Sequence, residues 1–116
     1  MALSEIERAR VDRAAELFLK KRRPPTHIRA KLDIACRLKG QSIQIVEVRP
    51  KWRGLPGEFM EHGAAKATFV RSRGVWRIYW LRKDLKWHSY EPVPEVRTIA
   101  DFFSVVHEDA YCCFFG

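Results

Sequence analysis

The stretch AAKATFVRSRGVWRIYWLRKDLKWHSY, residues 64–90, decides the fold. Apolar and polar residues alternate along it at period two, which is the pattern of β-strands with one buried face. The alternation is interrupted at Arg73-Gly74 and at Lys83-Asp84, where short turns fit. We therefore expect three antiparallel strands, over residues 65–72, 75–82 and 86–91.

The register of these strands predicts which side chains share a face. Two-residue loops at both turns would pair Ala67 with Trp80, and Trp80 with Trp87. One face is then apolar and consists of Ala65, Ala67, Phe69, Trp76, Ile78, Trp80 and Trp87. The other face consists of Lys66, Thr68, Val70, Arg77, Tyr79, Leu81, Lys86, His88 and Tyr90. Because side chains alternate strictly between faces, a slip of one residue at either turn would mix the two sets.

A further hairpin is predicted before these strands. Residues 32–50, LDIACRLKGQSIQIVEVRP, alternate on both sides of Lys39-Gly40 and predict strands over 31–39 and 42–49. The segment 50–64 carries two prolines and three glycines, so we expect a loop there.

A helix is predicted at each end of the chain. Over residues 4–22, Ser4 and Glu7 have the spacing of a capping box, and the basic run 20–23 suits the negative end of the helix dipole. The apolar residues of this helix fall on one broad arc: Leu3, Ile6, Val11, Ala14, Ala15, Leu17, Phe18 and Leu19. Over residues 98–108, Thr98 is the expected N-cap. A buried stripe follows it at helical spacing: Ile99, Phe102, Phe103 and Val106.

These elements predict the fold class. The chain of 116 residues fits a single domain, 1–116. We expect an α+β fold with a strongly twisted antiparallel sheet of about five strands, built from two or three hairpins and flanked by an N-terminal and a C-terminal helix. Adjacent hairpins argue against a parallel, doubly wound sheet.

Composition narrows the classes of partner. The net charge of +8 and the pI near 9.8 favour polyanions, either nucleic acid or an acidic protein surface. Three cysteines, two of them adjacent, indicate reduced thiols rather than disulfides. The four histidines are scattered singly, so we expect no metal site, and no motif indicates a cofactor. Without a signal peptide or a long apolar run, we expect a cytoplasmic protein with no membrane partner.

Three segments carry a resemblance to a known family. They are EVRPKW (residues 47–52), VWRIYWLRKDLKWHSYEP (75–92) and CFFG (113–116). On these segments the chain resembles a family of short bacterial proteins that is described only as a domain of unknown function. The resemblance covers essentially the whole length and implies a bacterial origin and a stand-alone single domain. It brings no catalytic residues with it.

Nucleic-acid binding is the first functional hypothesis. On the polar sheet face, Lys66, Arg77, Lys86 and His88 would neutralise phosphates, while Tyr79 and Tyr90 would stack on bases. Arg71, Arg73 and Arg82, near the strand ends, would add to the same positive field. The alternative is that a helix covers this face and leaves the cations as a rim.

A protein-interaction or self-associating module is the second hypothesis. The apolar tail YCCFFG (residues 111–116) and Trp52 could form a homodimer seam or bind a partner protein. The alternative is that the tail packs on the body of its own chain.

A metal-dependent nuclease is the third hypothesis. Asp33 on one strand and Glu47 and Arg49 on the next have the arrangement of a nuclease hairpin in which two carboxylates hold a divalent cation. Two observations argue against it. Arginine stays protonated where a lysine is expected, and the predicted register places Asp33 on the face opposite Glu47. The sequence therefore favours a non-enzymatic protein, and the alternative for Glu47 and Arg49 is an ion pair.

Overall fold

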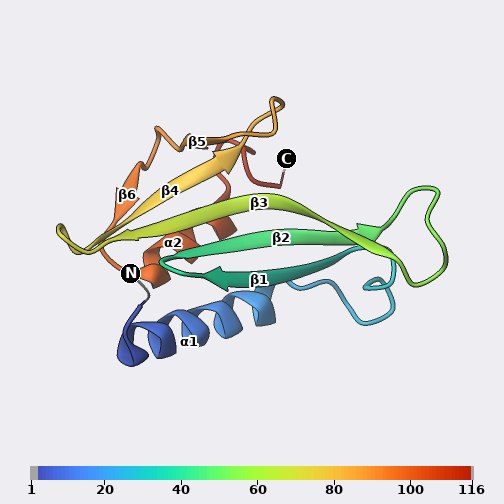
Figure 1. Cartoon of the computed structure of the whole chain (residues 1–116), viewed down its shortest axis with the longest axis horizontal. Helices are drawn as coiled ribbons and strands as arrows, with labels where there is room; N and C mark the ends of the chain where they lie inside the picture. The colour runs from blue at the N-terminus through green and yellow to red at the C-terminus, as the bar shows by residue number, and fades with distance from the viewer. Residues whose placement is uncertain (1–2, 116) are drawn as a thin grey trace.

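One antiparallel sheet forms a layer of the molecule, and two helices form the other layer (Figure 1). The computed structural model describes residues 3–115. The elements follow in the order α1 (Glu5–Arg22), β1 (Asp33–Lys39), β2 (Ser42–Pro50), β3 (Phe59–Val70), β4 (Val75–Leu81), β5 (Trp87–Ser89), β6 (Glu95–Val96) and α2 (Ile99–Glu108). The strand order is β1-β2-β3-β4-β5, and the short β6 also pairs with β4. The predicted α+β fold with a helix at each end is confirmed.

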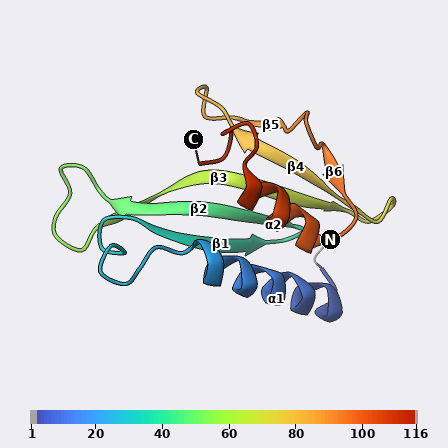
Figure 2. The ribbon, with the colours of Figure 1, turned by 180° about the vertical axis from the view of Figure 1, so that it is seen from behind.

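Both helices pack against the same face of the sheet (Figure 2). The Phe18 ring of α1 lies 5.1 Å from the Phe103 ring of α2, and both belong to the core between helices and sheet. The sheet contributes the apolar residues of its covered face: Ile34, Ile43, Ile45, Ala65, Ala67, Trp76 and Ile78. Within residues 3–115, the opposite face therefore carries no helix, and we call it the open face.

Capping fixes where each helix starts. The Ser4 hydroxyl accepts from the Glu7 N–H, and the Glu7 carboxylate accepts from the Ser4 N–H, so the predicted capping box is present. The Thr98 hydroxyl accepts from the Asp101 N–H at the start of α2, as expected for its N-cap.

The turn between β3 and β4 is longer than predicted, yet the faces are the ones expected. Ala67 pairs with Ile78 and Phe69 with Trp76, a shift of two residues from the predicted pairing. A shift by an even number leaves every side chain on its predicted face, because the strand period is two. In the first hairpin, a two-residue turn at Lys39-Gly40 would pair Leu38 with Gln41, whereas Leu38 pairs with Ile43. This shift is also of two residues, so the predicted faces are kept.

The turn between β4 and β5 changes the faces. Trp80 pairs with His88 and Leu81 with Trp87, which is one residue away from the predicted register. The Asp84 carboxylate accepts from the Lys86 N–H, and Leu85 has a φ of 61°. The loop between β4 and β5 is therefore longer than the predicted two residues. The predicted orientation of Trp87, His88 and Tyr90 is therefore wrong.

The predicted loop over residues 50–64 is partly strand. The first part of β3, from Phe59, pairs with the end of β2, so that only residues 51–58 connect them. A bulge between Ile45 and Val46 leaves Ala64 as an extra residue in β3. The strand therefore buries both Ala64 and Ala65.

The C-terminal tail packs on the body of the chain. The Asp109 carboxylate accepts from the N–H groups of Phe114 and Phe115, at 3.0 and 2.9 Å. The buried Phe114 ring lies 4.6 Å from the ring of Tyr90. Of the predicted tail segment, Gly116 lies outside the described residues. Within residues 3–115, none of the helices has the length and apolar character needed to cross a membrane.

Candidate nucleic-acid interface

The open face is organised in rows that run across the strands. Residues directly opposite each other in paired strands point to the same side of a sheet. The middle row crosses all five main strands and consists of Arg37, Gln44, Lys66, Tyr79 and Ser89. It therefore brings two basic side chains, one aromatic ring and two uncharged polar side chains into one line.

A second row runs beside the first, two residues further along each strand. It consists of Lys39, Ser42, Thr68, Arg77 and Glu95. The hydroxyls of Ser42 and Thr68 are 2.8 Å apart, and Glu95 forms an ion pair with Arg73. Arg77 is exposed and has no ion pair within residues 3–115.

The third row is apolar and ends in Trp87. It consists of Ala35, Val46, Gly63, Leu81 and Trp87. The indole of Trp87 reaches from β5 past Leu81 to Gly63 on β3, where a Cβ atom would lie 2.7 Å from Cζ2. The Nζ atom of Lys66 lies 5.7 Å from the ring centroids of both Trp87 and Tyr79. We call Lys66, Tyr79 and Trp87 the Lys66 cluster. Cation–π attraction holds this ammonium group beside the two rings.

Only part of the predicted binding set lies on the open face. Lys66, Arg77 and Tyr79 are there, as the alternation predicts. Tyr90 is 2% exposed and belongs to the core, so its predicted place on this face is wrong. His88 stands opposite Trp80 on the covered side, and its Nε2 atom lies 2.9 Å from the Asp84 carboxylate. The loop of β4–β5 causes both corrections.

The arginines near the strand ends are engaged by neighbouring groups. Arg71 donates two hydrogen bonds to Glu7 on α1, and Arg73 pairs with Glu95. The hydrogen bond from Arg71 is the main reason that the pKa of Glu7 is lowered to about 2. The guanidinium of Arg82 lies over the ring of Trp80, 5.4 Å from its centroid. These three side chains do not join the Lys66 cluster, and Lys86 lies exposed in the loop before β5.

Ion pairing leaves positive charge on the open face. Arg37 is paired with Glu61, and Arg73 with Glu95. Among the described residues of the two polar rows, Lys39, Lys66 and Arg77 have no carboxylate partner. A face with three uncompensated cations attracts anions.

The residues of the nuclease hypothesis lie apart. Asp33 stands opposite Val48, and Glu47 stands opposite Ile34, so the two carboxylates point to different faces of the hairpin. Asp33 accepts two hydrogen bonds from Arg23, which lower its pKa, and Glu47 pairs with Arg49 at 3.0 Å. Across residues 3–115, no three His, Cys, Asp or Glu side chains gather in a way that could hold a metal ion. The nuclease hypothesis stays a prediction.

Comparison with known sequences places the chain in a family. Residues 3–116 match the family described as Domain of unknown function (DUF3024). The chain belongs to this family. The match covers the length over which the resemblance was expected, and it assigns no site residue. No curated protein and no solved structure gives a significant match.

Sequence reasoning missed Trp87 as a residue of the open face. Its apolar character and the assumed two-residue turn both favoured the core. The signal that could have found it is Asp84, which is typical of longer turns because its carboxylate bonds to a backbone N–H two residues on. Gln44 and Lys39 were also missed as residues of the open face. The sequence pattern predicts no pairing between the first hairpin and the later strands, so it does not show that these residues share a face with Lys66.

Proposed function

We propose that this chain binds single-stranded nucleic acid on the open face of its sheet, without catalysing a reaction. The observation that carries the proposal is the Lys66 cluster beside Arg77, on a sheet face that no helix of the described chain covers. Basic side chains interleaved with aromatic rings are the general means by which proteins hold single strands.

The rows supply the two kinds of contact that a single strand requires. Lys39, Lys66 and Arg77 offer charge to phosphates, while the half-buried rings of Tyr79 and Trp87 offer surfaces to bases. The polar groups of Gln44 and Ser89 lie in the same row as Tyr79 and can hydrogen-bond base edges. Since the two polar rows are two residues apart along each strand, they are separated by about 7 Å.

Salt dependence tests the proposal. Fluorescence anisotropy with labelled single-stranded oligonucleotides, at several salt concentrations, should give a log–log slope of about −2. This value follows from about 0.7 per phosphate neutralised by each of the three cations. Single strands should bind more tightly than a duplex of the same length, because only unpaired bases can reach the rings. Absence of binding at low salt would overturn the proposal.

Matched variants distinguish binding by the open face from attraction to the overall positive charge. Arg77→Ala should weaken binding of all sequences alike and reduce the slope by about 0.7, whereas Arg77→Lys should retain the slope. Arg8 on the exposed surface of α1 provides the control, because Arg8→Ala removes the same charge far from the rows. Equal losses in Arg8→Ala and Arg77→Ala would show attraction to net charge alone, and the open face would then not be the site.

A further inference from the structure

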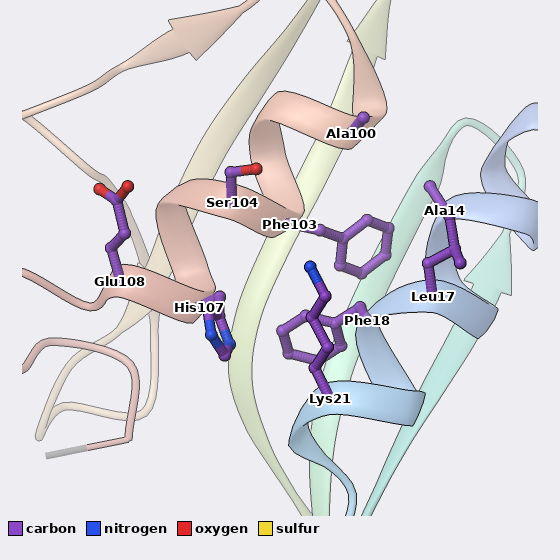
Figure 3. Close-up of a pocket in the computed structure, with 9 residues that line it drawn as sticks. All are labelled: Ala14, Leu17, Phe18, Lys21, Ala100, Phe103, Ser104, His107 and Glu108. Atoms are coloured by element: carbon purple, nitrogen blue, oxygen red, sulfur yellow. The ribbon is translucent and has the colours of Figure 1, made fainter.

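A groove runs between α1 and α2 on the helical side of the molecule (Figure 3). Its hollow has a volume of about 280 Å³, and the rings of Phe18 and Phe103 meet at its floor. Ala14 and Leu17 form the wall on α1, while Ala100 and Ser104 form the wall on α2 (Figure 3). The groove therefore has an apolar floor and remains open to solvent.

The α1 side of the groove presents a stripe that the core does not use. Ile6, Arg10, Arg13 and Leu17 follow one another at spacings of four, three and four residues, so they lie on one side of the helix. Ile6 is 68% exposed and Leu17 is 47% exposed, although both fall on the apolar arc predicted from the sequence. One exposed stripe of the helix therefore carries a large apolar side chain at each end and two arginines between them.

The α2 side of the groove is made of small residues. Ala100 and Ser104 are one helical turn apart, and both are exposed. Short side chains at this spacing allow the backbone of another helix to approach closely. Beyond Ala14 the groove widens into a second hollow of about 850 Å³, which Ile6, Arg10 and Arg13 also line. The combined length runs along most of α1.

The rim of the groove is positive. Arg10, Arg13 and Arg97 line the wider hollow, and Lys21 lines the narrower one. None of these four cations has an ion pair within residues 3–115. Of the acidic lining residues, Glu7 is bonded to Arg71, and the side chain of Glu108 points away from α1 (Figure 3). An acidic occupant would therefore meet uncompensated positive charge in both hollows.

We propose that this groove binds an amphipathic helix of a partner protein, with apolar anchors at helical spacing and acidic residues beside them. The apolar floor and the exposed Leu17 would receive the anchors, and Arg10, Arg13, Arg97 and Lys21 would face the acidic side chains. Helix-in-groove binding uses this combination: burial of the anchors provides affinity, and charge complementarity selects the partner and its orientation. The site lies on the face of the sheet opposite the Lys66 cluster, so it is independent of the proposed nucleic-acid interface.

A synthetic peptide tests this site directly. The probe is a capped helical peptide with leucines at positions i, i+3/i+4 and i+7 and with glutamates beside them. Its counterpart carries lysines in place of the glutamates. Titration into the ¹⁵N-labelled protein should shift the amide signals of Leu17, Ala100 and Ser104 in a saturable way for the acidic peptide only. Shifts confined to the open face, or equal binding of the lysine peptide, would overturn the proposal.

Substitutions in the groove provide the matched controls. Leu17→Gln and Ser104→Trp should each weaken binding of the acidic peptide at least tenfold, because the first removes an anchor contact and the second fills the groove. Glu16→Gln, on the neighbouring exposed position of α1, should not weaken binding. All these sites are exposed, so circular dichroism should show the native fold for each variant. Unchanged affinity in both groove variants would overturn the proposal, as would sedimentation showing a dimer that the acidic peptide does not dissociate.

Discussion

The ring of Trp87 lies across Gly63, so closely that a Cβ atom at position 63 would stand 2.7 Å from Cζ2 and 2.8 Å from Cη2. The two residues belong to β5 and β3, which are separated by β4. The indole therefore spans three strands of the open face and rests where no side chain intervenes. Glycine at position 63 provides the space in which Trp87 lies.

Gly63→Ala should displace the indole of Trp87 without unfolding the domain. The methyl group would force the ring outward, which separates it from Lys66 and weakens single-strand binding. The measurement is Trp fluorescence together with oligonucleotide anisotropy. In a Trp87→Ala background the same substitution should have little effect on binding, since the two effects are coupled through one contact. Additive losses in the double variant would contradict this account of the contact.

Arg71→Gln should raise the pKa of Glu7 towards its ordinary value of 4.5 from about 2. In the wild type the lowered pKa means that the ion pair contributes stability above pH 4.5, and this contribution is lost as the pH falls towards 2. The variant should therefore lose stability at neutral pH but approach the wild type in acid. Carboxyl NMR titration and urea unfolding at several pH values provide the measurement. A Glu7 titration that is unchanged in Arg71→Gln would contradict the prediction.

The three cysteines should react with thiol reagents at different rates. Burial raises the pKa of Cys36 to about 11, so its thiolate is scarce at neutral pH, and burial also raises the pKa of Cys113. Cys112 is exposed and should be modified first. Mass spectrometry of peptides after short exposure to iodoacetamide measures the order. Early labelling of Cys36 would indicate that β1 opens far more readily than its burial suggests.

Phe114→Ala should lower the free energy of unfolding by about 3–5 kcal/mol, the usual cost of truncating a buried phenylalanine. The side chain is 6% exposed and packs on Tyr90. Tyr111→Ala is the control, because this side chain is 68% exposed and should change stability by less than about 0.5 kcal/mol. Urea unfolding measures both.

Tyr111→Ala also tests the predicted homodimer seam. A seam formed by the tail would bury Tyr111 between two copies, so Tyr111→Ala would lower a concentration-dependent mass. Packing of the tail on its own body leaves the mass of this variant unchanged. Analytical ultracentrifugation over a range of concentrations distinguishes the two.

The elements of the fold could be predicted because their signals are local. The alternation in β3 and β4 requires no knowledge of the partner strand, and the Ser4–Glu7 capping box lies within a single helix turn. The pairing of β3 with β4 differs from the predicted pairing by two residues. The predicted faces are still correct, because the face of a side chain depends only on whether its position is odd or even. The register across the β4–β5 loop depends on loop length, which the local pattern does not encode.

The candidate site was predictable only where it lies on long strands. Lys66, Arg77 and Tyr79 were placed correctly by alternation alone. Trp87 was expected in the core and Tyr90 on the open face, and each lies on the other side. The pairing of β4 with β5 differs from the predicted register by one residue, and an odd shift exchanges the two faces. That the helices share one face was left open by the sequence, since each apolar helix stripe fits either side of a sheet.

The placement of both helices on one face leaves the residues of the other face with fewer packing constraints. Along β3 and β4, every second residue packs into the core between sheet and helices, and the residues between them lie on the open face. Substitutions at the latter positions should cost less stability than substitutions in the core. Members of the family could in this way acquire different ligands on one scaffold, and the alternate positions of two strands are where their sequences should be compared first.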